Sequence, residues 1–287
     1  MKIKLFLFDI DKTFVNRKLE VFKKTKDSVE YIKNKNDLAA LNTGRGPVTS
    51  KPIAEQAGIR YIVAFNGQSI FDYKENKYLY NNIMDKNLYT KLVKFLTKYN
   101  QSIITYGNEN MLEWDKDNVE TYYDSLSSDM QLEMSKYYHH DKFNDLSSYL
   151  KKFNSLNDNI IKVIVHTEDI KTLKEIVKDL KSNFEEFVYY YDSNPSPRPN
   201  VEVCLKDNNK MTGALKLIEL LKLKRNEVDL VAFGDGDNDV PIFKEADYSV
   251  ATLEAVPEID KLSNFKTGSS EDDNSISDGV KFIYKQY

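Results

Sequence analysis

The stretch KIKLFLFDIDKT, residues 2–13, decides the fold class of this chain. Its apolar run over residues 2–8 ends at Asp9, and turn-forming residues follow. A short apolar run that ends in polar turn residues is typical of a central, buried parallel strand. A secretory signal peptide is not expected, because Asp9 interrupts the run and no small-residue cleavage site follows it.

Strands and helices alternate on both sides of this run. Near the N-terminus, strand-like runs over residues 38–41 and 61–65 are separated by helical patterns over residues 25–35 and 52–58. The pattern returns later, with strands over residues 201–205, 228–233 and 248–251, a helix over residues 211–223 and a terminal helix containing Val280, Ile283 and Tyr284. This alternation predicts an α/β fold with a parallel sheet and right-handed crossovers.

The middle of the chain has a different pattern. Helical spacing is seen at Leu88, Leu92, Phe95 and Leu96 and again from Ile170 to Leu180, and strand-like runs cover residues 101–106, 111–114, 159–166 and 187–191. The polar, tyrosine-rich stretch over residues 121–156 predicts a further helix. We therefore expect an inserted α+β domain over residues 83–187 and a core formed by residues 1–82 and 188–287.

Composition and charge exclude several classes of protein. The 287 residues carry 41 Lys and Arg against 45 Asp and Glu, a formal net charge of −4. This balance argues against nucleic-acid binding, which needs a basic surface. The single cysteine, Cys204, excludes an internal disulfide framework and suits a reducing, cytoplasmic compartment. No apolar run approaches the roughly 20 residues that cross a bilayer, so we expect no membrane partner; the oligomeric state is left open.

Six polar side chains follow the expected parallel strands or open the next helix. They are Asp9, Asp11, Thr43, Lys210, Asp235 and Asp239. Because ligands of open α/β sheets bind outside the carboxyl ends of the strands, we expect these side chains to share one site.

The chemistry of this set points to phosphoryl transfer. Carboxylates gathered in one cleft repel one another unless a cation lies among them, and hard oxygen ligands favour Mg²⁺. A lysine and a threonine at the same edge can hold phosphate oxygens. One carboxylate can attack phosphorus, and a second, two residues along, can protonate the leaving oxygen and later activate water.

Each motif alone has an ordinary explanation. Asp9 and Asp11 could lie in a solvated turn, and Lys210 could be a surface lysine at a helix start. Residues 234–239 could form a turn, although they lack the distal glutamate of an EF-hand. The shared placement of these motifs at strand ends favours a common site.

With these motifs the chain resembles the haloacid dehalogenase (HAD) superfamily of hydrolases, and specifically its Cof-type (subclass IIB) phosphatases. The motifs are DIDKT (9–13), LNTGR (41–45), NKMTG (209–213) and GDGDND (234–239), joined by FNG (65–67) and VEV (201–203). The resemblance implies a Rossmann-like parallel-sheet core with an inserted α+β (C2-type) cap that selects the leaving group. It also implies Mg²⁺ as cofactor and a small phosphomonoester, such as a sugar phosphate, as substrate.

The resemblance implies a role for each motif residue. Asp9 would be the nucleophile and a metal ligand, and Asp11 the general acid/base, with its main-chain carbonyl on the metal. The remaining metal ligands would be Asp235 and Asp239. Phosphate or substrate would be bound by Thr43, Gly44, Arg45, Lys210 and Asn238, with Asn66 near the substrate side.

Lys12 departs from the family pattern, because similar proteins usually have glycine at this position. If the position requires a positive φ, a lysine costs conformational energy. For three further residues of the inserted domain we expect no role in the site: Trp114 should pack in a core, and His139 and His140 should be solvated.

The same motifs bear on three alternatives to the phosphatase. A phosphomutase of the same superfamily would return the phosphoryl group to a bound sugar, but the 234–239 motif resembles the hydrolase pattern. A non-catalytic sugar-phosphate sensor would have no need of Asp11. A dehalogenase would need neither Asp11 nor Mg²⁺.

Overall fold

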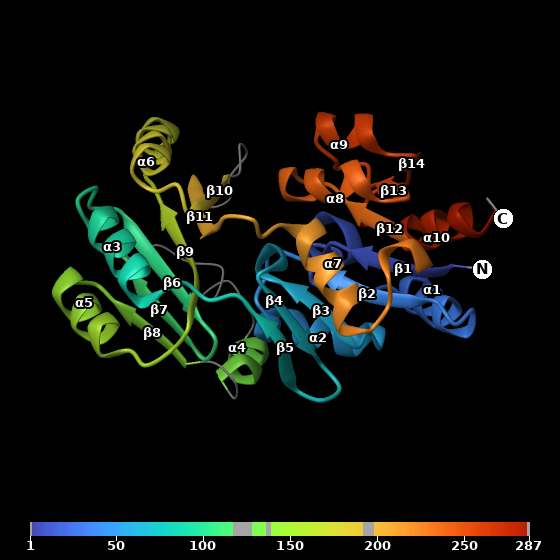
Figure 1. Ribbon diagram of the computed structural model, residues 1–287, viewed down its shortest axis with the longest axis horizontal. Helices are drawn as coiled ribbons and strands as arrows, with labels where there is room; N and C mark the ends of the chain where they lie inside the picture. Colours follow the sequence, from blue (N-terminus) through green and yellow to red (C-terminus); the bar gives the residue numbers. More distant parts are fainter. Residues whose placement is uncertain (1, 117–127, 136–138, 192–197, 286–287) are drawn as a thin grey trace. The chain divides into compact units, whose positions relative to one another are not determined.

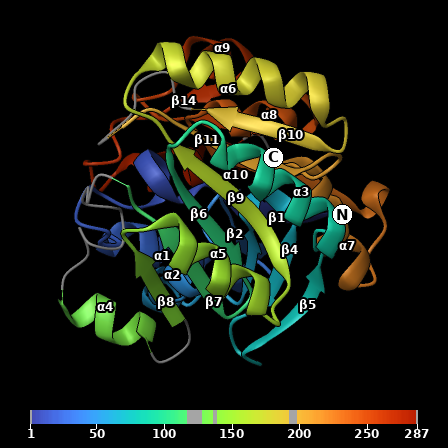
Figure 2. The same ribbon diagram turned by 90° about the vertical axis from the view of Figure 1, so that its left-hand side faces the viewer.

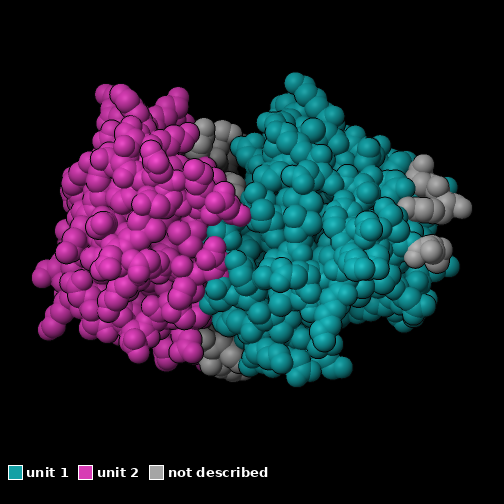
Figure 3. Space-filling view, viewed as in Figure 1, with its two compact units in different colours: residues 1–81, 208–287 teal, residues 82–207 magenta. Residues whose placement is uncertain are grey.

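The computed structural model describes residues 2–116, 128–135, 139–191 and 198–285 (Figure 1). The chain divides into two compact units, Met1–Asn81 with Asn208–Tyr287 and Asn82–Asp207 (Figure 3). Each unit has its own sheet and its own apolar core. Within the described ranges, no helix is long and apolar enough to cross a membrane.

The first unit is built on an eight-stranded sheet in the order β14-β13-β12-β1-β2-β3-β4-β5. Its strands are β1 (Ile3–Phe8), β2 (Leu38–Asn42), β3 (Tyr61–Ala64), β4 (Ser69–Asp72), β5 (Lys77–Asn81), β12 (Val228–Gly234), β13 (Tyr248–Ala251) and β14 (Phe265–Lys266). Its α-helices are α1 (Lys23–Asn34), α2 (Pro47–Ala57), α7 (Lys210–Leu220), α8 (Val240–Glu245), α9 (Pro257–Leu262) and α10 (Ser275–Lys285). The strands from β14 to β3 run parallel, as predicted, and β4 and β5 add an antiparallel edge.

Strand β1 lies inside this sheet, between β12 and β2, and is apolar on both faces. Leu5 and Leu7 belong to a core cluster with residues of α7, α8 and α9. Phe6 points to the opposite layer, where its ring stacks on Tyr284 of α10 with centroids 5.8 Å apart. A parallel strand with helices over both faces needs such a continuous apolar run, which explains the pattern in the sequence.

The chain leaves β1 through a tight turn, Ile10–Phe14, that reverses its direction beside Asp9. Lys12 has φ 54° and ψ 14°, the left-handed conformation that favours glycine. The hydroxyl of Thr252 donates a hydrogen bond to the main-chain carbonyl of Lys12 at 3.0 Å. The turn is therefore anchored to the chain after β13. Position 12, where the similar proteins usually have glycine, does have a positive φ.

The second unit has a six-stranded mixed sheet in the order β10-β11-β9-β6-β7-β8. Its strands are β6 (Ser102–Gly107), β7 (Asn110–Trp114), β8 (His139–Phe143), β9 (Ile160–His166), β10 (Phe187–Tyr191) and β11 (Asn200–Leu205). Its helices are α3 (Lys86–Thr97), α4 (Ser128–Ser135), α5 (Leu146–Ser155) and α6 (Ile170–Asn183). Apolar residues of α3, α5 and α6 pack on one face of the sheet (Figure 2). The expected α/β core with an inserted α+β unit is thus confirmed.

The end of the inserted unit differs from the expectation. We expected the core to resume at residue 188, with residues 201–205 as a core strand. Instead β11 pairs antiparallel with β10 and β9, and Val201 and Val203 point into the core of the second unit. The unit therefore ends at Asp207. A short alternating strand carries no sign of which sheet it joins, and pairing with β9 decides it here.

Two further expectations for this unit need correction. The predicted helix over residues 121–156 is interrupted by strand β8, and residues 117–127 and 136–138 lie outside the described residues.

Trp114 is buried in the core, as predicted, and His139 is exposed. His140 is not solvated, because its Nε2 lies 2.9 Å from Oε2 of buried Glu113. The buried carboxylate on β7 gives the imidazole a polar partner inside the unit.

Candidate active site

Three carboxylates and one ammonium group meet at the carboxyl ends of β1 and β12. Lys210 Nζ lies 2.6 Å from Asp9 Oδ1 and 2.6 Å from Asp239 Oδ1. Carboxylate oxygens of Asp9, Asp235 and Asp239 lie within 4.8 Å of one another. All four side chains are buried, and Lys210 is fully inaccessible to solvent. The fold thus brings together residues that are more than 200 positions apart in the sequence, as the strand-end rule predicts.

Asp239 is positioned by hydrogen bonds to the main chain at the end of β12. Its Oδ2 accepts hydrogen bonds from the N–H groups of Asp235 and Gly236, each at 3.1 Å. A β-carbon on Gly234 would lie 2.3 Å from Asp239 Cγ, so any other residue at this position would displace the carboxylate. The GDGDND motif therefore places its last aspartate beside Lys210 through a close approach that only glycine allows.

Lys210 is positioned as the first residue of α7. The Asn209 side chain accepts hydrogen bonds from the N–H groups of Met211 and Thr212, and the Thr212 hydroxyl accepts one from the Asn209 N–H, which closes a capping box. Gly67 packs directly against this helix start, and a β-carbon there would lie 2.2 Å from the Asn209 carbonyl oxygen. The start of α7 is thus held from two sides, which fixes the base of the lysine side chain.

The polar groups after β2 and β3 form a second part of the site. Thr43 is buried, and its hydroxyl accepts a hydrogen bond from the Arg45 N–H at 3.1 Å. Asn238 Nδ2 donates to Asn66 Oδ1 at 3.0 Å, and a β-carbon on Gly44 would meet the Asn66 side chain at 3.3 Å. The structure therefore places Gly44, Asn66 and Asn238 side by side.

Arg45 contacts a carboxylate in this structure. Its Nε donates to Asp11 Oδ2 at 2.7 Å, and its Nη2 donates to Asp11 Oδ1. Such a fork is the strong, oriented form of an ion pair. Loss of solvent would raise the pKa of Asp11, but the charge and hydrogen bonds of Arg45 outweigh this and lower it. Asp11 is therefore held as a carboxylate, with its side chain outside the Asp9, Asp235 and Asp239 group.

The remaining carboxylates carry more negative charge than the lysine neutralises. Burial raises the pKa of Asp9 well above its usual range, and Asp239, Asp235 and Asp11 add to the increase, against the opposing charge of Lys210. Burial and the neighbouring Asp239 raise the pKa of Asp235 to about 7. Burial alone would lower the pKa of Lys210, but Asp239 and Asp9 raise it, so the ammonium stays charged.

This donor set fits a hard divalent cation. Three buried carboxylates with oxygens within 4.8 Å of one another share one ammonium, and a cation would lower the cost of ionising Asp9 and Asp235. Oxygen-only ligands of this kind suit Mg²⁺ or a similar ion. The side chain of Asp11 is not part of the set, and its expected contribution was the main-chain carbonyl.

The sequence pattern of a family described as haloacid dehalogenase-like hydrolase matches residues 6–280. The chain belongs to this family. Bacillus subtilis YkrA is 24% identical over 290 residues, which cover 100% of this chain and 98% of that protein. The Escherichia coli 5-amino-6-(5-phospho-D-ribitylamino)uracil phosphatase YbjI is 24% identical over 275 residues, or 94% of this chain and 92% of that one. A haloacid dehalogenase-like hydrolase structure from B. subtilis has the same fold, with a TM-score of 0.79 at 17% identity over 98% of this chain and all of that chain.

The family assignment confirms the resemblance seen in the sequence, including the Cof-type phosphatase branch. The sequence did not single out two residues that hold members of this HAD site in place. Thr13 Oγ1 donates to Asp235 Oδ1 at 3.2 Å, and Asn42 Nδ2 donates to the Lys210 carbonyl at 3.1 Å. Thr13 closes the DIDKT motif that Asp9 opens, and Asn42 directly precedes Thr43, so these positions were the available signal.

Adding Mg²⁺ is expected to raise the midpoint of thermal unfolding, and to raise it more at pH 8 than at pH 6. The raised pKa of Asp235 means that a proton competes with the cation below about pH 7. In the metal-free protein, the same raised pKa contributes stability at low pH that is lost as the pH rises through about 7. Differential scanning fluorimetry with Mg²⁺ or EDTA measures both effects. Asp235→Asn is the control and should lose most of the response; equal shifts at the two pH values would contradict the prediction.

Replacing Lys12 by glycine is expected to stabilise the protein by about 1 kcal/mol. A left-handed residue with a β-carbon costs roughly 1–2 kcal/mol, and part of the gain is lost to the greater freedom of glycine in the unfolded chain. Urea unfolding of wild type and Lys12→Gly measures the difference. Lys12→Ala removes the charge but keeps the β-carbon, so it should not stabilise. If the two variants are equally stable, backbone strain at this position is not the cause.

Proposed function

We propose that this HAD phosphatase hydrolyses small phosphomonoesters, such as sugar phosphates, with Mg²⁺ and through an aspartyl-phosphate on Asp9. The observation that carries the proposal is the buried contact of Lys210 with Asp9 at the end of β1. It pairs a nucleophile with a cation that can hold a phosphate, and Asp11 follows two residues along. The names of relatives support the substrate class, because YbjI and B. subtilis YwtE are both 5-amino-6-(5-phospho-D-ribitylamino)uracil phosphatases.

In the first half-reaction an Asp9 oxygen attacks phosphorus, and the bond from phosphorus to the ester oxygen breaks. Asp11 gives its proton to the departing oxygen, which leaves as an alcohol. Lys210 and the Thr43 hydroxyl hold oxygens of the transferring group. Mg²⁺, held by Asp9, Asp235 and Asp239, would supply charge neutralisation for that group.

In the second half-reaction Asp11 takes a proton from a water molecule, whose oxygen attacks phosphorus on the side opposite Asp9. The acyl-phosphate bond breaks, Asp9 returns to a carboxylate and inorganic phosphate is released. The fork between Arg45 and Asp11 cannot persist through this cycle, because Asp11 must carry a proton in the first step. A substrate phosphate that attracts Arg45 would release Asp11 for its role.

The proposal is tested by phosphate release from p-nitrophenyl phosphate and from a panel of sugar and nucleotide phosphates. Wild type should release phosphate with Mg²⁺ and not with EDTA. Asp9→Asn is nearly isosteric and should reduce turnover by at least about 10³-fold while the thermal midpoint shows that it is folded. Asp11→Asn should slow both half-reactions.

Other results would replace the proposal. An isomerised sugar phosphate with little free phosphate would identify a phosphomutase. A folded protein that binds Mg²⁺ and sugar phosphates without turnover would identify a sensor. Substantial turnover by Asp9→Asn would remove Asp9 as the nucleophile.

Replacing Arg45 by glutamine is expected to weaken substrate binding and to change the pH dependence of kcat/KM. Loss of the guanidinium removes a phosphate partner, so KM should rise about tenfold. It also removes the main influence that lowers the pKa of Asp11 in the free enzyme, so the alkaline limb of the kcat/KM profile should move to higher pH. Arg60→Gln is the matched control, since Arg60 forms a comparable fork with Asp72 away from the site. An unchanged limb would show that Arg45 does not act on Asp11 in the free enzyme.

A further inference from the structure

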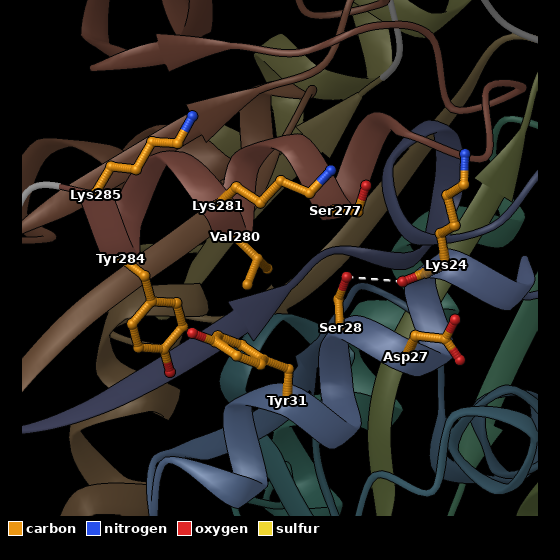
Figure 4. Close-up of a pocket in the computed structure, with 9 residues that line it drawn as sticks. All are labelled: Lys24, Asp27, Ser28, Tyr31, Ser277, Val280, Lys281, Tyr284 and Lys285. Carbon is orange, nitrogen blue, oxygen red and sulfur yellow. Dashed lines mark hydrogen bonds between the residues drawn. The ribbon is translucent and has the colours of Figure 1, made fainter.

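A groove runs between α1 and α10 in the first unit, with a volume of about 530 Å³ (Figure 4). Its lining residues are Lys24, Asp27, Ser28, Tyr31, Ser277, Val280, Lys281, Tyr284 and Lys285. The groove has no part in the phosphoryl-transfer site, because none of these residues belongs to it. Its volume falls within the roughly 300–1,000 Å³ of sites that hold small organic ligands.

The groove is a consequence of small residues on both helices. Ser28 on α1 and Ser277 and Val280 on α10 are buried at the base of the groove, where larger side chains would fill the space between the helices. Ser28 is not available as a donor, because its hydroxyl donates to the Lys24 carbonyl at 2.7 Å. The base therefore offers a mainly apolar floor.

Two tyrosines close one end of the groove. Tyr284 is held in place, because its hydroxyl donates to Asp37 Oδ2 at 2.7 Å and its ring stacks on Phe6. Tyr31 stands edge-on to it, with ring centroids 5.2 Å apart and planes at 89°, and keeps 45% of its surface exposed. Asp37 also accepts a hydrogen bond from the Lys4 N–H, which places this end beside the start of β1, opposite Asp9. An exposed ring on a fixed neighbour is a preformed surface for a flat ligand.

The residues that line the groove carry a net positive charge, and carboxylates outside the lining lie near two of its three lysines. Three lysines line it against one aspartate, and Asp27 already pairs with Lys23 at 2.6 Å outside the lining. Lys281 is exposed and has Asp278 at 3.1 Å, and Lys24 bonds Asn274 at 2.6 Å with Asp273 at 3.8 Å. Figure 4 shows Lys281 and Lys285 on α10, on the helix that also carries Tyr284. Because both lysines line the groove, an anionic group on a ligand bound there would be attracted to them.

We propose that this groove binds an aromatic organic anion, meaning a flat ring system that carries a carboxylate, sulfonate or phosphate group. The ring would pack on Tyr31 and over Val280, and the anionic group would lie between Lys281 and Lys285. The inference does not depend on the proposed phosphatase activity, because no residue that lines the groove belongs to the catalytic site.

Naphthalene-2-sulfonate is a suitable probe, because it has the required ring and charge but no phosphate ester to hydrolyse. Ligand-observed NMR titration of the full chain should show saturable binding with a dissociation constant of about 1 mM, as expected for a ligand of this size. Tyr31→Ala, and separately the pair Lys281→Gln with Lys285→Gln, should each weaken binding at least about tenfold.

Matched variants separate the groove from other sites. Tyr31→Phe keeps the ring and should bind like wild type, and the pair Lys26→Gln with Lys261→Gln removes the same charge from exposed positions that do not line the groove. Asp9→Asn, which alters the catalytic site but not the groove, should leave probe binding unchanged. Absence of saturable binding to wild type would overturn the proposal, and so would binding that persists in both groove variants or is lost in Asp9→Asn.

Discussion

The buried ammonium of Lys210 between Asp9 and Asp239 is the interaction on which the rest of the site depends. A charged group without solvent is costly unless it is paired, and removing one partner of such a pair costs about 3–5 kcal/mol. Here each partner comes from a different part of the chain: the end of β1, the start of α7 and the turn after β12. The contacts that position these side chains therefore also stabilise this edge of the sheet. The capping box of α7 and Gly67 support the pairing, because they fix the start of the lysine side chain.

The pairing is incomplete, and this imbalance gives a cation a favourable place in the site. One lysine cannot neutralise three buried carboxylates, so the pKa values of Asp9 and Asp235 are raised. Burying these carboxylates lowers the stability of the folded chain locally, as is common at binding sites, and leaves a site where binding of a cation and a phosphate would be favourable. Asp11 lies outside this balance, because Arg45 supplies it with a separate cation from the loop after β2. The two aspartates of the DIDKT motif thus have opposite environments two residues apart, as the proposed roles of nucleophile and acid/base require.

The fold and the membership of the site were predictable because parallel strands place their carboxyl ends at one edge. The apolar run of β1 signalled a strand buried on both faces, and Asp9, Lys210 and Asp239 were found together from their positions at strand and helix ends. The short β4 and β14, with four and two residues, gave too little pattern to be seen. Strand β11 was found but assigned to the wrong sheet, since alternation tells which side chains share a face and not which strand lies alongside.

By itself, then, the amino-acid sequence determined the alternation of strands and helices in the core, the presence of an inserted second unit and the set of polar residues that gather at the carboxyl ends of the strands. These follow from local patterns of side-chain size and polarity, which each short segment carries within itself. The tertiary structure alone decided which side chains contact one another. In the first unit Arg45 binds Asp11 and Asn238 donates to Asn66, and in the second unit His140 pairs with buried Glu113. It also decided that small residues on α1 and α10 leave a groove between the helices. Such contacts depend on the packing of segments far apart in the chain, and no local pattern contains that information.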